Sequence, residues 1–219
     1  SDTTEVVNAP VNNDLNYGAN FTQNTSIYLP NVEYRAQNAD YLNVEILVES
    51  ENGTMMDVMN ANARRVVGDI YKVNNAYFEA LEYGDYEVTY ISTDLAGNKT
   101  IVSYTITVAQ DTSDLTVGFK LNSQINGGEE ANRGDEIVLG VPTFTTNADD
   151  SVLEYVGYEI EIDKAATLVG KTKFIPMDKG VYHITYKGYA TVLQDATING
   201  VDYFVGDEVE FASQTYTLT

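Results

Sequence analysis

Residues 78–90 read FEALEYGDYEVTY, and residues 174–186 read FIPMDKGVYHITY. Each segment begins with Phe, places Gly six residues later, and then alternates Tyr, Val or Ile, and Tyr with polar residues. An apolar residue at every second position is typical of a β-strand that buries one face. Because the same skeleton occurs twice, we infer an internal repeat in which each copy contains such a strand.

Weaker matches extend the repeat toward both ends of the chain. In sequence order, the matching pairs are residues 2–4 with 111–113, Ile27 and Leu29 with Ile137 and Leu139, residues 38–40 with 147–149, and residues 104–106 with 216–218. The spacing between copies varies, so we expect insertions near residues 50–76 in the first copy and near residues 190–212 in the second. The copies meet at the short polar link of residues 109–112, which predicts two domains, residues 1–110 and residues 111–219.

Other segments predict sheets with one apolar and one polar face. Apolar residues alternate with Glu, Asp, Ser or Thr over residues 44–48, 102–108 and 158–162. This pattern is typical of antiparallel strands that face a core on one side. The segment Asp94-Leu-Ala-Gly-Asn98 predicts a hairpin turn, and Asn199-Gly200 predicts an extra hairpin near residues 196–205 of the second domain.

Residues 55–67 interrupt the strand pattern and hold three of the four methionines. Their spacing predicts a short helix with Met56, Met59 and Ala63 on one side, although Asn60 and Asn62 disfavour a helix. We interpret the segment as a helical or irregular cap on the end of the core. A methionine-rich binding surface is the alternative.

The composition narrows the class of partner. The net charge is −21, and the acidic excess is even, with 15 acids against 5 bases before Gln110 and 18 against 7 after it. Such a chain repels phosphate backbones and anionic lipid, so we expect no nucleic acid partner. No run approaches eighteen apolar residues, and we expect no membrane insertion in this segment. The absence of cysteine excludes disulfides and thiolate chemistry.

The pair Gly84-x-Tyr86, repeated as Gly180-x-Tyr182, resembles the tyrosine corner of immunoglobulin-like sandwiches. The resemblance implies that each Tyr hydroxyl bonds to backbone upstream in the chain, and that these four residues have a structural role. Two residues after each Tyr, where antibody domains have Cys, stand Val88 and Ile184. The chain also lacks Trp, which places it far from antibody domains.

Residues 78–108, with the Asp94–Asn98 turn and a Thr- and Val-rich last strand, resemble bacterial immunoglobulin-like repeats of cell-surface proteins. The second copy keeps Phe174-x-Pro176 and Gly180-x-Tyr182 but lacks that turn. The resemblance implies an all-β chain of two tandem immunoglobulin-like antiparallel β-sandwiches, located outside the cell. It also implies a non-catalytic structural or adhesive module, such as a stalk, a spacer, an adhesin or an S-layer unit.

Little in the sequence indicates catalysis, and we expect no enzyme. His183 is the only histidine, and alternation places it on an exposed face, so no His-based triad or zinc site can be built. Arg133-Gly134-Asp135 matches a tripeptide of integrin ligands but also fits an ordinary turn before a strand.

Two kinds of ligand remain as hypotheses. We expect other surface proteins or glycans as partners, and the alternative function is a carbohydrate-binding or accessory module of a secreted polysaccharide-degrading protein, with exposed tyrosines stacking on sugars. We expect no cofactor except weakly bound calcium at the domain link. Asp111 and Asp114 would be ligands, helped by Asp94 or by an acidic loop such as Asp149-Asp150. The competing interpretation is that each Asp bonds its own turn.

Overall fold

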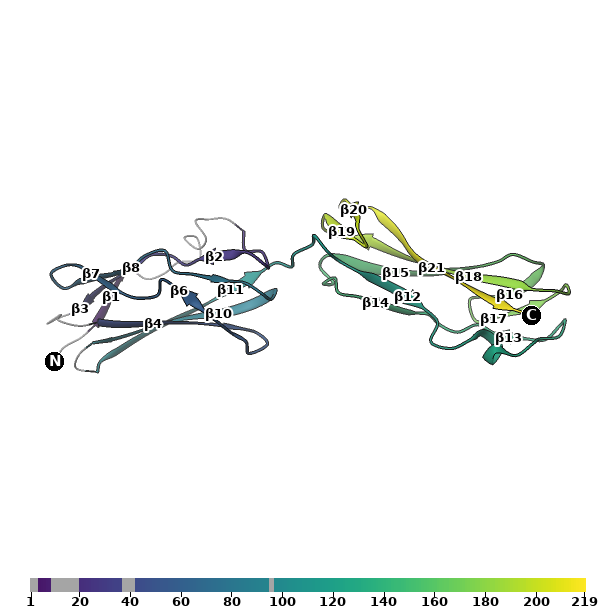
Figure 1. The fold of residues 1–219 in the computed structure, drawn as a ribbon, viewed down its shortest axis with the longest axis horizontal. Helices are drawn as coiled ribbons and strands as arrows, with labels where there is room; N and C mark the ends of the chain where they lie inside the picture. Colours follow the sequence, from purple (N-terminus) through teal and green to yellow (C-terminus); the bar gives the residue numbers. More distant parts are fainter. Residues whose placement is uncertain (1–3, 9–19, 37–41, 95–96) are drawn as a thin grey trace. The chain divides into compact units, whose positions relative to one another are not determined.

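The computed structural model describes residues 4–8, 20–36, 42–94 and 97–219. The chain divides into two compact units, Ser1–Asp111 and Thr112–Thr219, called unit 1 and unit 2 below (Figure 1). The predicted division lies one residue earlier. The described residues form antiparallel sheets with one short 3₁₀ turn at Ile125–Gly128 and no α-helix, which confirms the all-β fold class.

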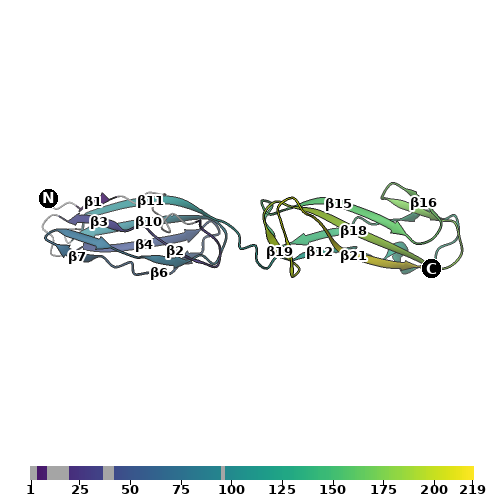
Figure 2. The same cartoon turned by 90° about the horizontal axis from the view of Figure 1, so that it is seen from above.

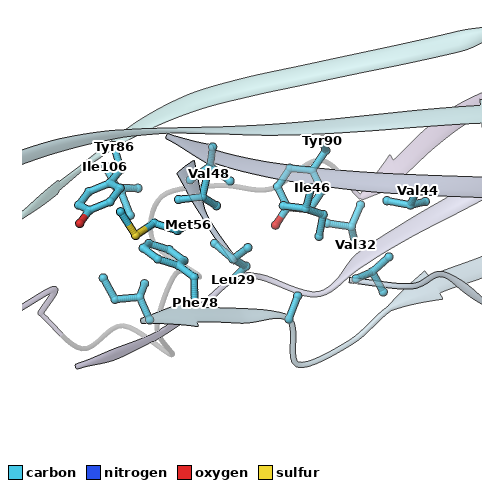
Figure 3. Packing of buried hydrophobic residues seen from close by; sticks show 14 of the residues in the cluster. Leu29, Val32, Val44, Ile46, Val48, Met56, Phe78, Tyr86, Tyr90 and Ile106 are labelled. Atoms are coloured by element: carbon cyan, nitrogen blue, oxygen red, sulfur yellow. The ribbon is translucent and has the colours of Figure 1, made fainter. Parts of the chain in front are cut away.

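Unit 1 packs one sheet against two others with a single core between them (Figures 2 and 3). In spatial order, the first sheet contains β11 (Lys99–Val108), β10 (Gly84–Asp94), β4 (Leu42–Ser50) and β5 (Met55–Met56). The second contains β2 (Ser26–Tyr28), β9 (Tyr77–Glu79) and β6 (Val58–Met59), and the third contains β1 (Thr4–Asn8), β3 (Val32–Ala36), β8 (Ile70–Val73) and β7 (Arg64–Val67). Because every second residue of β4 and β10 is buried, these strands supply one wall of the core.

Unit 2 has its own core. Like the first sheet of unit 1, its largest sheet has one long strand between two neighbours. That sheet contains β15 (Leu153–Ile162), β18 (Tyr182–Val192) and β21 (Glu208–Leu218). The other strands are β13 (Ile137–Val138), β17 (Lys173–Pro176) and β16 (Ala166–Val169) in one sheet, β12 (Val117–Lys120) with β14 (Thr143–Thr146), and β19 (Ala196–Ile198) with β20 (Val201–Tyr203).

The strand registers repeat from one unit to the other. Ile27 is the register partner of Phe78 in unit 1, and Ile137 is the partner of Phe174 in unit 2. Tyr86 pairs with Ile106 in the same way that Tyr182 pairs with Leu218. These residues of the sequence repeat therefore occupy the same cross-strand positions in both sandwiches, whereas residues 2–3 and 38–40 of the repeat lie outside the described residues.

Both predicted hairpins are present. Strands β10 and β11 pair as far as Thr93 and Lys99. Asp94 stabilises the turn between them, because its carboxylate accepts hydrogen bonds from the backbone and side-chain nitrogens of Asn98, both at 2.8 Å. Strands β19 and β20 are joined by Asn199 and Gly200, with φ of 49° and 78°. Two successive positive φ values are those of the tight hairpin turn that Asn-Gly favours.

The helix expected within residues 55–67 is wrong, because the segment forms the short strands β5, β6 and β7. Met56 pairs with Val48 in one sheet, whereas Met59 pairs with Tyr77 in the facing sheet, so the chain crosses from one sheet to the other between them. Asn60 then takes a positive φ of 58°, which a right-handed helix does not allow. Only Met56 is buried; Met55 and Met59 are exposed.

We expect each unit to fold without the other, because each has a separate core. Fragments of residues 1–111 and 112–219 should each unfold in one cooperative transition when followed by circular dichroism and tyrosine fluorescence in urea. The two midpoints should match the two transitions of the whole chain. A fragment without a cooperative transition would show that its core depends on the other unit.

Candidate functional site

The tyrosine corner of unit 1 ties the start of β10 to the residues before it. Tyr86 is buried, and its hydroxyl accepts a hydrogen bond from the Glu82 backbone N–H at 3.0 Å and donates one to the Glu82 carbonyl at 2.7 Å. Burial is the main cause that raises the pKa of Tyr86, so its hydroxyl keeps the proton that it donates. The ring packs against Phe78, with the centroids 5.5 Å apart.

Unit 2 has the same corner with one additional partner. The Tyr182 hydroxyl accepts a hydrogen bond from the Asp178 backbone N–H at 2.9 Å, and two carbonyl oxygens, of Asp178 and Ala165, lie 2.9 and 3.0 Å away as acceptors. Its ring packs against Phe174, with the centroids 6.0 Å apart. In both units, the Phe and the Tyr of the sequence repeat are therefore in contact inside the core.

Gly84 and Gly180 precede the two corners with φ of +111° and +120°. L-residues with a side chain rarely adopt these angles. A Cβ atom at Gly84 would also lie 2.2 Å from Glu51 Oε1, and one at Gly180 would lie 2.9 Å from Lys164 Nζ. The backbone angle is the stronger reason for Gly, since both side-chain ends can move.

The two aspartates proposed as calcium ligands have different surroundings. Asp111 belongs to unit 1, where its carboxylate accepts a hydrogen bond from the Asn24 amide at 3.1 Å and its backbone N–H donates to Gln23 Oε1 at 3.2 Å. Asp114 belongs to unit 2 and is exposed. In residues 4–8, 20–36, 42–94 and 97–219, no group of three or more His, Asp or Glu is placed to hold a metal ion. Calcium binding here stays a prediction.

Two of the acidic residues proposed to assist calcium, Asp94 and Asp149, are engaged in turns. Asp94 uses both carboxylate oxygens to accept hydrogen bonds from Asn98. Asp149 accepts hydrogen bonds from the backbone and hydroxyl of Ser151, which together lower the pKa of Asp149. These hydrogen bonds agree with the competing interpretation of Asp94 and Asp149, in which an Asp bonds to groups of its own turn.

His183 lies on the exposed face of β18, where its Nδ1 is 2.7 Å from the carboxylate of Asp163. Hydrogen bonds from the backbone and ring of His183 lower the pKa of Asp163.

The tripeptide at residues 133–135 is an ordinary turn: the Asp135 carboxylate accepts from the backbone N–H of Asn132 at 2.8 Å, and the Gly134 N–H donates to Pro176 O. The Asp135 carboxylate therefore has an internal partner.

Few aromatic rings are available for stacking on sugars. Among the tyrosines that the structure describes, Tyr155 is the most exposed, at 38%. It stacks on Phe144 with the centroids 4.7 Å apart and an angle of 11° between the planes. Tyr155 is therefore the tyrosine that best fits the sugar-stacking hypothesis, and one of its faces is already covered.

The sequence interpretation did not identify one polar hollow, which lies in unit 1 over residues 60–75 and includes Arg64, Arg65 and Lys72. The available signal was the adjacent pair of arginines, because unit 1 has only five basic residues. A helical or irregular cap over residues 55–67 would not have placed Arg64 opposite Lys72, as the β7–β8 pairing does.

Comparison with known proteins gives likenesses of fold only. No family model and no curated protein matches the sequence. Solved structures with a similar backbone include protocadherin gamma B2 extracellular cadherin domains 3–6, at 12% identity and a TM-score of 0.49, covering 100% of this chain and 50% of that one. Others are Bacteroides ovatus SGBP-B of a mixed-linkage glucan utilization locus, in complex with a mixed-linkage heptasaccharide (17%, 0.30, 96% and 47%), and the Clostridium thermocellum CbhA fibronectin(III)-like modules (11%, 0.26, 99% and 93%).

The architecture follows from the structure itself, in which antiparallel sheets enclose a separate core in each unit. Both units are immunoglobulin-like β-sandwiches. The chain spans about half the length of the protocadherin fragment that it resembles. Among the residues that the structure describes, no helix is long and apolar enough to cross a lipid bilayer.

Proposed function

We propose that these two immunoglobulin-like sandwiches form a non-catalytic structural module, a spacer or surface-array unit, of an extracellular cell-surface protein. The proposal rests on one observation: backbone hydrogen bonds hold the chain on both sides of the link, at Ala109 and at Thr112. Its partners would be other surface proteins or glycans, and the acidic exterior suits a solvated surface.

On the unit 1 side, backbone hydrogen bonds connect Phe21 and Gln23 with Ala109, at 2.9 and 2.8 Å, next to the exit of the chain. These bonds join an early segment to the last strand in a parallel bridge centred on Thr22. Pulling along two parallel neighbouring segments loads their hydrogen bonds together instead of one after another. This arrangement therefore supports a load-bearing role for unit 1.

On the unit 2 side, hydrogen bonds begin at the first residue. The Thr112 carbonyl accepts from the Thr197 N–H at 2.8 Å, and Leu115 exchanges backbone bonds with Thr197 and Asn199 on the β19–β20 hairpin. Only Gln110 and Asp111 separate Ala109 from Thr112. Tension along the chain would thus reach hydrogen-bonded residues on both sides without first extending a long linker.

Pulling a single molecule by its ends tests the proposal. We expect two separate force peaks, each followed by a gain in contour length somewhat below about 36–40 nm. That figure is the extended length of the roughly 110 residues of each unit at about 3.3–3.6 Å each, from which the length spanned by the folded unit is subtracted. Gln23→Pro removes the N–H that bonds Ala109 and should lower the peak force of unit 1, while that of unit 2 stays unchanged. Extension without force peaks would contradict a load-bearing spacer.

A further inference from the structure

A polar hollow of about 670 Å³ opens on unit 1 over the β7–β8 hairpin. Its volume is within the range of about 300–1,000 Å³ that is usual for small-ligand sites. The lining consists of four asparagines, three basic residues and one valine: Asn60, Asn62, Asn74, Asn75, Arg64, Arg65, Lys72 and Val66. Among these lining residues there is no carboxylate and no aromatic ring.

The strand register explains why these side chains gather. Arg64 on β7 is the register partner of Lys72 on β8, so the two side chains point to the same face of the hairpin. Asn62 and Asn74, which lie just outside the two strands, also line the hollow. Both asparagines are exposed. Pairing in this hairpin therefore brings Arg64 and Lys72 together at the hollow.

The charge of the hollow is opposite to that of the protein. The chain has a net charge of −21, and unit 1 has five basic residues, of which three line this hollow. Lys72 Nζ lies 3.2 Å from a carboxylate oxygen of Glu33, which offsets one of these charges. For Arg64 and Arg65, no ion pair with a carboxylate is present in the part of the chain that the structure describes.

Arg64 and Lys72 are cations in register, and Glu33 offsets the charge of Lys72 but not that of Arg64. Like charges directly opposite each other on neighbouring strands destabilise a sheet. Arg65 donates from Nε to the Gly68 carbonyl at 2.6 Å, which leaves its terminal nitrogens as donors. An anion bound beside Arg64 and Arg65 would offset the positive charge that Glu33 does not, and it would accept hydrogen bonds from the terminal nitrogens of Arg65.

We propose that this hollow binds an acidic polysaccharide through the carboxylates of its uronic acid residues, a ligand class that goes beyond the proposed spacer function. The guanidinium group suits a carboxylate because its planar donors match two oxygens at once. Asparagine amides both donate and accept, which suits sugar hydroxyls. A neutral sugar would lack an aromatic face for stacking here, so the anionic sugar fits better.

Calorimetric titration of the whole chain with a hexamer of galacturonic acid tests the proposal. We expect saturable binding, and no binding of a neutral hexamer of glucose. Arg64→Gln should weaken binding at least about tenfold, as expected when one charge-assisted hydrogen bond is lost. Asn62→Asp, which adds a charge of the same sign as the ligand, should weaken binding by a similar factor. Lys99→Gln is the matched control, because it also removes one positive charge from an exposed residue of unit 1, at the start of β11. It should change the affinity less than twofold.

Three results would overturn the proposal. The first is an Arg64→Gln affinity equal to that of the native chain while circular dichroism shows a native fold. The second is equal binding of the neutral hexamer. The third is equal or tighter binding of hexaglutamate, which would identify the hollow as a site for acidic peptides. None of these results depends on whether the units bear mechanical load, so failure here is distinguishable from failure of the spacer.

Discussion

Phe78→Ala is expected to destabilise unit 1 by about 3–5 kcal/mol, and Phe174→Ala to do the same in unit 2. Both side chains are fully buried, and each contacts the corner Tyr of its own unit. Figure 3 shows Phe78 below Tyr86 and Met56, between the two walls of the core. Removing the ring leaves a cavity that the surrounding strands fill only in part, so the loss exceeds the transfer free energy of the ring alone.

The effect should be confined to the unit that carries the change. In urea unfolding of the whole chain, Phe78→Ala should lower only the midpoint of unit 1, and Phe174→Ala only that of unit 2. Because small domains have total stabilities of about 5–15 kcal/mol, a loss of this size can leave the affected unit largely unfolded. Leu81→Ala is the control, since that side chain is 63% exposed and should change the midpoint little. A loss below about 1 kcal/mol for both Phe variants would contradict the core assignment.

Tyr86→Phe and Tyr182→Phe are expected to cost about 1–2 kcal/mol each. The ring stays in place, but the backbone groups of Glu82 or Asp178 lose their hydroxyl partner. Water can replace part of that bonding, because Glu82 is half-buried and Asp178 is exposed, so the cost should be at the low end for a lost hydrogen bond. Urea midpoints of each unit measure the loss.

Tyr34→Phe provides a matched control for the two corners. Tyr34 is also buried in unit 1, but its hydroxyl has no hydrogen-bond partner among the residues that the structure describes. Removing that hydroxyl should leave the midpoint of unit 1 unchanged or raise it, since an unsatisfied buried polar group disfavours the folded state. If Tyr34→Phe and Tyr86→Phe lower the midpoint equally, the loss at Tyr86 is that of any buried hydroxyl and does not come from the corner hydrogen bonds.

Local features of the sequence predicted the framework of the fold well. Alternation along residues 44–48, 86–90 and 182–186 predicted strands because the side-chain period of a strand is two, independent of the partner strand. The Asn199-Gly200 and Asp94–Asn98 turns were predictable because their chemistry is local: positive φ in one, and side chain to backbone hydrogen bonds in the other. The repeated Phe and Tyr also predicted which residues of the two domains are equivalent, and these residues occupy equivalent cross-strand positions in the structure.

The prediction failed where the outcome depended on distant partners. The strands of residues 55–67 are too short to show a period, and each is fixed by a different neighbour: β5 by β4, β6 by β9 and β7 by β8. A sequence window that contains only the segment itself cannot distinguish this path from one turn of helix, because Met and Ala favour a helix in isolation.

The sequence by itself determined that this protein has two copies of one strand pattern, and that each copy has a Phe followed by the Gly-x-Tyr pair of a tyrosine corner. Only the tertiary structure decided what the acidic and basic side chains do. Asp94 and Asp149 are engaged in turns, while Arg64 and Lys72 meet across β7 and β8 to form a cationic hollow. The physical reason is that burial and turn chemistry act along the chain, whereas the charge of a surface depends on which strands become neighbours.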